Sequence, residues 1–185
     1  MSEYDFMLKR IKKLIIDVPD FPKPGILFKD ISPIFGDQSE LRNLITMQAR
    51  WIKKDGRDFD KIVAIESRGF LLGTLLAYET GLPLVLARKA GKLPRETVSA
   101  VYGLEYGKDK IEIHKDDISR DEHVLIVDDV LATGGTATAV ANIVDELGGK
   151  VAGFWFLMQI NGLGGHDTLV NKTGVDDSDI EVVLY

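Results

Sequence analysis

Short apolar stretches recur along the chain, and each is followed by a polar turn. They occupy residues 62–65, 84–87, 124–127 and 151–158. Stretches of this length without polar alternation are typical of strands buried on both faces of a sheet. Apolar residues at helical spacing lie between them, over residues 69–78 and 137–147. The alternation of strand and helix predicts an α/β fold with a mainly parallel sheet flanked by helices.

The first part of the chain has a different pattern. Apolar residues at helical spacing predict a helix over residues 3–16, and a second helix is expected over residues 40–54 with Ser39 as its N-cap. Three prolines within residues 17–25 exclude a helix there and favour an extended, irregular path. We expect one domain over residues 1–185, with this N-terminal segment lying over it.

Residues 91–115 depart from the alternation of strand and helix. They begin polar, with glycine and proline, and continue as two strand-like pieces over residues 98–106 and 110–115. Residues 107–109 would join the two pieces in a hairpin. Long excursions from a compact domain are often functional lids, so we expect a flap here.

Composition and charge narrow the class of protein. The chain has 185 residues, 45% hydrophobic and 28% charged, and a net charge of -6. This acidic balance argues against a nucleic-acid binder, although a local group of cations can still bind one small polyanion. The absence of cysteine excludes disulfides and thiol catalysis, and the isolated His114, His123 and His166 are expected on the surface. No apolar stretch approaches the ~20 residues of a membrane span, and the N-terminus lacks a signal-peptide pattern, so a cytoplasmic protein is expected.

Residues 124–136 carry the clearest candidate chemistry. Asp128 and Asp129 follow the third apolar stretch, at the edge where open α/β sheets bind their ligands. The loop Ala-Thr-Gly-Gly-Thr, residues 132–136, then opens onto a helix. Its glycines allow close backbone approach, the helix N-terminus attracts negative charge, and its threonines add hydroxyl donors. Together these features predict a cradle for a phosphate monoester.

The carboxylates restrict what can bind beside this cradle. Since like charges repel, Asp128 and Asp129 suit hydroxyl groups or a Mg²⁺ ion, and hydroxyls next to a phosphate describe ribose 5-phosphate. An aspartate pair or two glycines alone usually mark an ordinary turn, but the whole string is far more specific. It lacks the Gly-Lys-Ser/Thr of a P-loop, and no good Gly-x-Gly-x-x-Gly follows a strand. Triphosphatases and dinucleotide-binding proteins are therefore disfavoured.

Two further places are candidate anion sites. Residues 66–69 lie where the first apolar stretch meets a helix, and exposed N–H groups beside Arg68 favour an anion, unless this is an ordinary turn with a surface arginine. Positions 87–95 hold four cations and no acidic residue, which is either an anion clamp or a solvated basic loop. These cations are Arg88, Lys89, Lys92 and Arg95.

Residues 124–136 resemble the signature with which type I phosphoribosyltransferases bind phosphoribosyl pyrophosphate (PRPP). Within that family the chain resembles the adenine phosphoribosyltransferases, through residues 21–31, 66–70, 88–94 and 104–107. These strings occur in the family's order, so the resemblance covers about residues 4–165. It implies the type I phosphoribosyltransferase fold, with an N-terminal hood over about residues 1–36 and a flexible flap over about residues 91–115.

The resemblance also assigns roles to individual residues. Glu105 in the flap would exchange a proton with the adenine ring. The ribose and 5′-phosphate of PRPP would bind to Asp128, Asp129, Ala132, Thr133, Gly134, Gly135 and Thr136. Pyrophosphate would bind to Glu66, Ser67, Arg68, Arg88, Lys89 and Lys92. Adenine would lie against Phe21, Leu27, Val130 and Lys29, the last of which stands where many relatives carry arginine.

The implied reaction belongs to purine salvage: adenine and PRPP give AMP and pyrophosphate. The resemblance implies Mg²⁺ as cofactor, bound through PRPP with Asp128 and Asp129 as candidate ligands, and a homodimer. Two alternatives remain open, a phosphoribosyltransferase for another base and a PRPP-sensing regulatory protein on the same fold. Residues 21–31 argue against the first, and the acidic charge and the chain length argue against the second.

Overall fold

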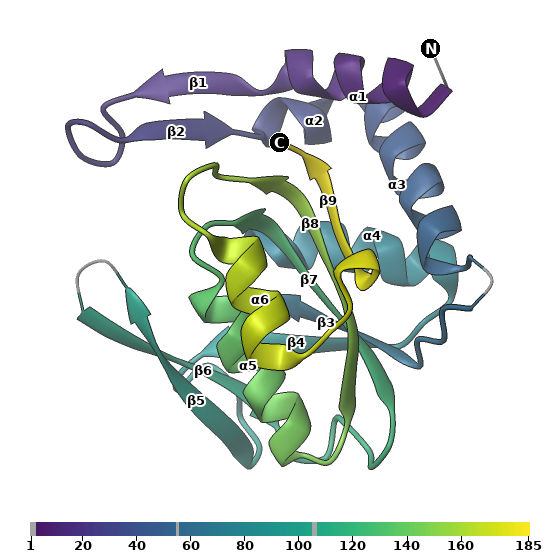
Figure 1. Cartoon of the computed structure of the whole chain (residues 1–185), viewed down its shortest axis with the longest axis vertical. Coiled ribbons are helices and arrows are strands. Elements are labelled where there is room, and N and C mark those ends of the chain that lie inside the picture. The colour runs from purple at the N-terminus through teal and green to yellow at the C-terminus, as the bar shows by residue number, and fades with distance from the viewer. Residues whose placement is uncertain (1–2, 55, 105–106) are drawn as a thin grey trace. The chain divides into compact units, whose positions relative to one another are not determined.

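The computed structural model describes residues 3–54, 56–104 and 107–185 (Figure 1). The chain divides into two compact units, Met1–Trp51 and Ile52–Tyr185. Each unit has its own secondary structure, and the candidate residues are distributed over both.

The first unit combines helices with a two-stranded antiparallel sheet. Its elements are α1 (Glu3–Leu14), β1 (Ile16–Pro19), β2 (Leu27–Asp30), α2 (Ser32–Gly36) and α3 (Gln38–Ile52). In α1 the buried Met7 and Ile11 lie one turn apart, which confirms the helix predicted from the apolar spacing. β1 and β2 pair along their whole length, so the proline-containing stretch is more regular than expected. Pro19 fits because it ends a strand that has a free edge.

The start of α3 differs from the expectation. The helix begins at Gln38, and the Asp37 side chain accepts a hydrogen bond of 3.0 Å from the backbone N–H of Glu40. Asp37 therefore caps the helix, and Ser39 lies in its first turn, so the predicted N-cap was wrong. Aspartate and serine both cap helices well, and the local backbone decides between them.

The second unit is built on a sheet with the strand order β5-β6-β4-β3-β7-β8-β9. Its strands are β3 (Lys61–Ile65), β4 (Leu84–Lys89), β5 (Thr97–Leu104), β6 (Gly107–His114), β7 (His123–Leu131), β8 (Lys150–Gln159) and β9 (Ile180–Leu184). The five strands β4, β3, β7, β8 and β9 are parallel, and the β5–β6 hairpin joins them antiparallel through β4. The mainly parallel α/β fold predicted from the sequence is confirmed.

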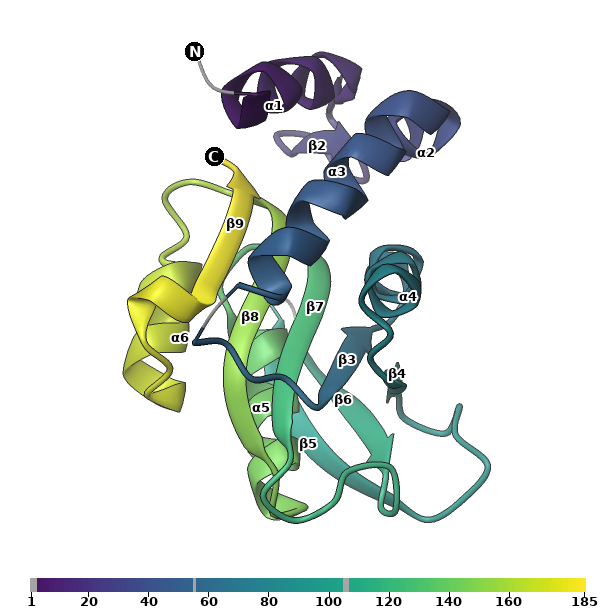
Figure 2. The same ribbon diagram turned by 90° about the vertical axis from the view of Figure 1, so that its right-hand side faces the viewer.

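Helices cover both faces of this sheet. They are α4 (Arg68–Thr80), α5 (Gly135–Glu146) and α6 (Gly165–Thr173), and a short 3₁₀ turn, Asp177–Asp179, precedes β9. Figure 2 shows α4 on one face and α5 and α6 on the other. On the α5 face, Val63 and Ile65 belong to the same buried cluster as Val140 and Val144. Because both faces are covered, β3 is apolar throughout its buried part, as the sequence predicts.

Two strand boundaries differ from the expectation. β7 continues through Asp128 and Asp129 to Leu131 because β8 is long enough to pair with it that far. In the hairpin, β5 and β6 pair as far as Leu104 with Gly107, so residues 107–109 lie in a strand and not in the turn. The sequence signal for a turn came from Gly107 and the polar residues after it, which the pairing with β5 overrides.

The C-terminal segment gave little signal in the sequence, yet it completes the fold. β9 pairs in parallel with the apolar strand β8, and α6 covers the same face as α5. None of the helices within residues 3–54, 56–104 and 107–185 combines the length and apolar character needed to cross a bilayer.

Candidate active site

The turn between β7 and α5 forms a small, tightly built cavity. Gly134 has a φ of 78°, and a Cβ atom added there would lie 2.8 Å from the carbonyl oxygen of Gly165. The turn therefore requires glycine for both its backbone angle and its packing. The cavity has a volume of about 60 Å³ and is lined by Asp128, residues 130–137 and Phe156. Backbone N–H groups at the start of α5 face an anion favourably, so this turn has the chemistry of a phosphate cradle.

Two adjacent carboxylates stand beside the cradle. The backbone N–H of Asp129 donates to Oδ1 of Asp128 at 2.8 Å, and Nε of Arg68 lies 2.7 Å from Oδ2 of the buried Asp129. Burial, and then the neighbouring charge of Asp129, raise the pKa of Asp128 well above its usual value of 3.8. The pair thus offers one carboxylate neutralised by arginine and one that resists ionisation.

Gly69 is a site residue whose importance only the structure explains. A Cβ atom there would lie 2.8 Å from Oδ1 of Asp128 and 3.0 Å from the carbonyl oxygen of Val127. The first turn of α4 can therefore approach the carboxylates only with glycine at this position. The sequence singles out Gly69 as part of a string, but it does not say that β7 lies against it.

Glu66, at the end of β3, gathers two of the predicted pyrophosphate cations. Its Oε2 atom accepts from Nε of Arg88 at 3.2 Å and from the backbone N–H of Lys89 at 3.1 Å, and Oε1 pairs with Nζ of Lys92. Burial would raise the pKa of Glu66, but hydrogen bonds from Lys92, Lys89 and Arg88 outweigh it and lower the pKa. The carboxylate is therefore ionised and already occupied by cations.

The fourth cation of the loop, Arg95, has different partners. Its Nη2 lies 2.6 Å from Oδ1 of Asp117 and 2.9 Å from Nδ1 of His114. His114 is buried, so the expectation that it lies on the surface was wrong. Its ring is buried without loss because Arg95 and Asp117 both bond to it.

Tyr102 in β5 is a further residue that the sequence does not single out. Its hydroxyl donates to Oδ2 of Asp109 at 3.3 Å and also forms a hydrogen bond with Thr136 at the start of α5. Asp109 in turn pairs with Nζ of Lys89 at 3.1 Å. Only the register of the hairpin, which sets Tyr102 opposite Asp109, brings these groups together.

The predicted adenine contacts are divided between the units. In the first unit Phe21 and Leu27 are half exposed, and Lys29 forms an ion pair of 2.6 Å with Asp17, its partner across β1 and β2. Val130 lies in β7 of the second unit. Glu105, the predicted proton-transfer residue, lies outside the described residues.

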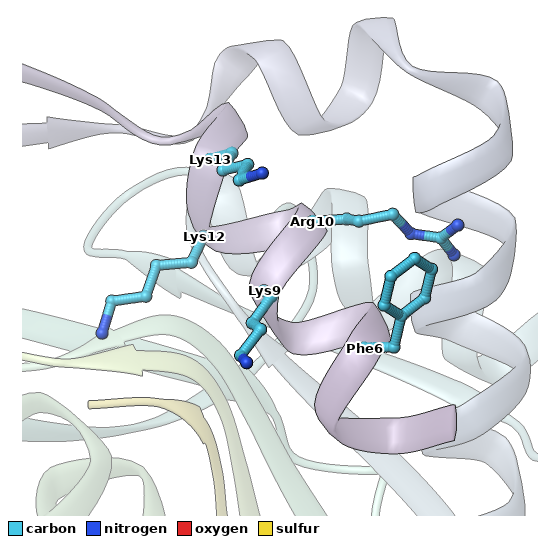
Figure 3. Close-up of a pocket in the computed structure, with 5 residues that line it drawn as sticks. All are labelled: Phe6, Lys9, Arg10, Lys12 and Lys13. Atoms are coloured by element: carbon cyan, nitrogen blue, oxygen red, sulfur yellow. The ribbon is translucent and has the colours of Figure 1, made fainter. Parts of the chain in front are cut away.

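A surface hollow along α1 carries another group of cations. Figure 3 shows Phe6, Lys9, Arg10, Lys12 and Lys13 along its wall. The guanidinium of Arg10 stands 4.7 Å from the Phe6 ring centre and pairs with Glu40 at 3.0 Å. These contacts give Arg10 a structural role within the first unit.

The candidate metal ligands are few. Among the described residues, no group of three or more histidines, aspartates or glutamates is arranged to hold a metal ion. Asp128 and Asp129 offer the oxygen atoms that Mg²⁺ prefers, and an ion carried by substrate phosphates needs only one or two protein carboxylates. The pair therefore fits a Mg²⁺ that arrives with a phosphorylated ligand.

Comparison with known proteins identifies the class that this fold and site define. The family model of the phosphoribosyl transferase domain matches residues 36–181, which span the cradle, the carboxylates and the cation-bearing turns. The resemblance seen in residues 124–136 is therefore confirmed at the level of the family.

Individual relatives narrow the class further. The adenine phosphoribosyltransferase of Salinispora arenicola is 47% identical over 164 residues, 89% of this chain and 86% of that protein. The crystal structure of adenine phosphoribosyltransferase from Thermoanaerobacter pseudethanolicus has a TM-score of 0.88 at 47% identity, covering 96% of this chain and 98% of that one. The Saccharomyces cerevisiae enzyme, complexed with an imino-altritol bisphosphate and adenine, has a TM-score of 0.88 at 36% identity, covering 97% and 99%. The chain belongs to the adenine phosphoribosyltransferase family.

Proposed function

We propose that the protein transfers the 5-phosphoribosyl group of PRPP to adenine, giving AMP and pyrophosphate in purine salvage. The observation that carries this proposal is the 2.7 Å pair between Arg68 and Asp129, which brings the cation-bearing turn beside the carboxylates and the cradle. A ligand with a phosphate at one end, hydroxyls in the middle and a polyanion at the other end matches that order of groups. The activity named for the relatives supports the same reaction.

The carboxylates would act on the ribose. Residues 132–136 anchor the 5′-phosphate, and Asp128 and Asp129 accept hydrogen bonds from the ribose hydroxyls. As the bond to pyrophosphate breaks, positive charge develops on the ribose ring, and nearby carboxylate oxygens stabilise it electrostatically. Adenine attacks the opposite face of the anomeric carbon, and no protein nucleophile is required.

The cations would act on the leaving group. Arg68 is held by Asp129, Arg88 and Lys92 by Glu66, and Lys89 by Asp109. The negative charge of pyrophosphate draws these cations from their carboxylates, with Ser67 and the start of α4 adding polar contacts. In this proposal Glu66 positions Arg88 and Lys92 and does not itself contact the anion, because a carboxylate repels pyrophosphate. When bound, Mg²⁺ supplies further positive charge to the pyrophosphate oxygens.

The remaining assignments rest on the resemblance. Phe21, Leu27, Lys29 and Val130 contact adenine, and Glu105 exchanges a proton with its ring nitrogen. A cytoplasmic location and a homodimer are the expected setting. Leu71 and Tyr78, two turns apart on α4, are 51% and 87% exposed, and such a face favours contact with a second copy.

Pyrophosphate release from PRPP and Mg²⁺ tests the proposal, with adenine, guanine, hypoxanthine, xanthine and orotate supplied separately. Turnover with adenine alone is expected. Turnover with another base would retain the PRPP chemistry but refute the adenine assignment. PRPP binding without turnover on any base would favour the regulatory alternative. A Glu105→Gln variant should retain PRPP binding and lose most of the transfer rate, as expected for a general acid or base.

A further inference from the structure

A buried tyrosine connects the β5–β6 hairpin to the phosphate cradle. Tyr102 is 8% exposed, and its hydroxyl bonds both to Asp109 on the neighbouring strand and to Thr136 in the first turn of α5. The backbone follows the same course, since a Cβ atom at Gly135 would lie 3.6 Å from the carbonyl oxygen of Gly103. The hairpin is therefore in van der Waals contact with the cradle at this point.

The hydrogen bonds have a defined direction. Tyr102 has one proton, which it donates to Asp109 at 3.3 Å, so its oxygen must accept from the hydroxyl of Thr136. The backbone N–H of Lys110 and the ammonium of Lys89 lower the pKa of Asp109, so this acceptor is ionised. Burial, and then the charge of Asp109, raise the pKa of Tyr102, so the phenol keeps the proton that it donates.

We propose that Tyr102 is a positioning residue that fixes the flap hairpin against the phosphate cradle. It acts through Thr136 on one side and Asp109 on the other, and it does not touch the reacting atoms. Along this edge of the hairpin, the connection from the cradle passes through a single hydroxyl group. Its loss should loosen β5 and β6 while leaving the parallel strands β3, β7 and β8 as they are.

The proposal is tested first without any ligand. In Tyr102→Phe, amide hydrogen exchange in β5 and β6 should accelerate about fivefold, the effect of one hydrogen bond, with no change in β3 or β8. Tyr78→Phe removes the hydroxyl of an exposed tyrosine on α4 and should leave exchange in the hairpin unchanged. Unchanged exchange in Tyr102→Phe, or equal acceleration in Tyr78→Phe, would overturn the proposal.

A double-mutant cycle assigns the effect to the contact with Thr136. Thr136→Val should accelerate hairpin exchange as much as Tyr102→Phe, and the double variant should add nothing further. Asp109→Asn keeps an acceptor for Tyr102 but removes the ion pair with Lys89, and it should have a smaller effect than Tyr102→Phe. Additive single effects, or an Asp109→Asn effect as large as that of Tyr102→Phe, would place the anchor elsewhere and refute the proposal.

The consequence for catalysis rests on the proposed function. A loosened flap admits water, so Tyr102→Phe should release several times more pyrophosphate per AMP formed than the parent protein. A purely structural role would lower the amount of active protein without changing this ratio, so an unchanged ratio alongside faster exchange would refute the link to catalysis. If the parent protein forms no AMP at all, the proposed function fails, while the exchange measurements still decide the anchoring role.

Discussion

The two strand-to-helix turns of the site hold their candidate anions by different means. The turn after β7 uses glycine, backbone N–H groups and a cavity of about 60 Å³. The turn after β3 uses long charged side chains, and Glu66 and Asp129 occupy the cations Arg88, Lys92 and Arg68 before any ligand arrives. The first is preorganised for a phosphate that stays attached throughout the reaction. The second must exchange ionic partners, which suits a group that leaves.

This difference predicts that backbone changes should be most severe in the cradle. In Gly134→Ala, the left-handed backbone costs about 1–2 kcal/mol and the new Cβ meets the Gly165 carbonyl at 2.8 Å. The KM for PRPP should rise more than about a hundredfold, since each 1.4 kcal/mol is tenfold in affinity. Gly81→Ala is the matched control, because Gly81 has a φ of 77° but no atom within 4 Å of its added Cβ. The control should lose about 1 kcal/mol of stability and keep its KM; an equal rise in KM would contradict a specific role for the cradle.

The carboxylates should separate stability from activity. Asp128→Asn should lower kcat/KM about a hundredfold, as removal of a charge-stabilising group does, and yet stabilise the fold at neutral pH. The pKa of Asp128 is raised on folding, so its favourable contribution is complete below about pH 4 and is lost as the pH rises toward the raised pKa. The difference in free energy of unfolding between variant and parent should therefore grow from pH 4 to pH 7 in urea titrations.

Asp145 in α5 provides the control for this prediction. Burial raises its pKa as well, and it lies outside the candidate site residues. Asp145→Asn should show the same sign of pH dependence and unchanged activity. A loss of stability in Asp128→Asn at pH 7 would show that its carboxyl is stabilised in the folded state, against the account given above.

Changes in the side-chain turn should be milder. Glu66→Gln leaves Arg88 and Lys92 without their shared anion, and disorder of these cations should raise the KM for PRPP about tenfold. Glu122→Gln disturbs a comparable pair, with Nζ of Lys61 at 2.7 Å, away from the candidate site, and should leave KM unchanged. Steady-state kinetics at several PRPP concentrations distinguishes the two variants.

The smallest effect is expected at Arg95. Its guanidinium is held by Asp117 and His114, so it does not join Arg88 and Lys92 at Glu66. Arg95→Gln should change the KM for PRPP less than about twofold, whereas Lys92→Gln should raise it about tenfold. Equal effects would return Arg95 to the pyrophosphate cations with which the sequence groups it.

Apolar pattern predicted the parts of the fold that are buried on both sides. The stretches that became β3, β4, β7 and β8 were visible because a covered parallel strand tolerates few polar residues. Edge elements such as β1 and β2 lack that pattern. The continuation of β7 through Asp128 and Asp129 was missed because carboxylates resemble a loop, and only pairing with β8 keeps them in the strand.

The candidate site was predictable where a local string carries its chemistry. Residues 132–136 form a cradle from consecutive positions, so the sequence alone describes it. The contacts of Glu66, Tyr102 and His114 depend on partners from 16 or more to fewer positions away along neighbouring strands, and register decides them. Such contacts follow from the fold and have no local signature.

The division of labour between the two turns is tested most directly by titrating ribose 5-phosphate and Mg²⁺-pyrophosphate separately into Gly134→Ala and Glu66→Gln. Calorimetry should show that Gly134→Ala loses affinity for ribose 5-phosphate and retains pyrophosphate binding, while Glu66→Gln shows the reverse. If both variants lose both ligands equally, or if the pattern is exchanged, the two turns do not hold separate ends of PRPP and the account is wrong.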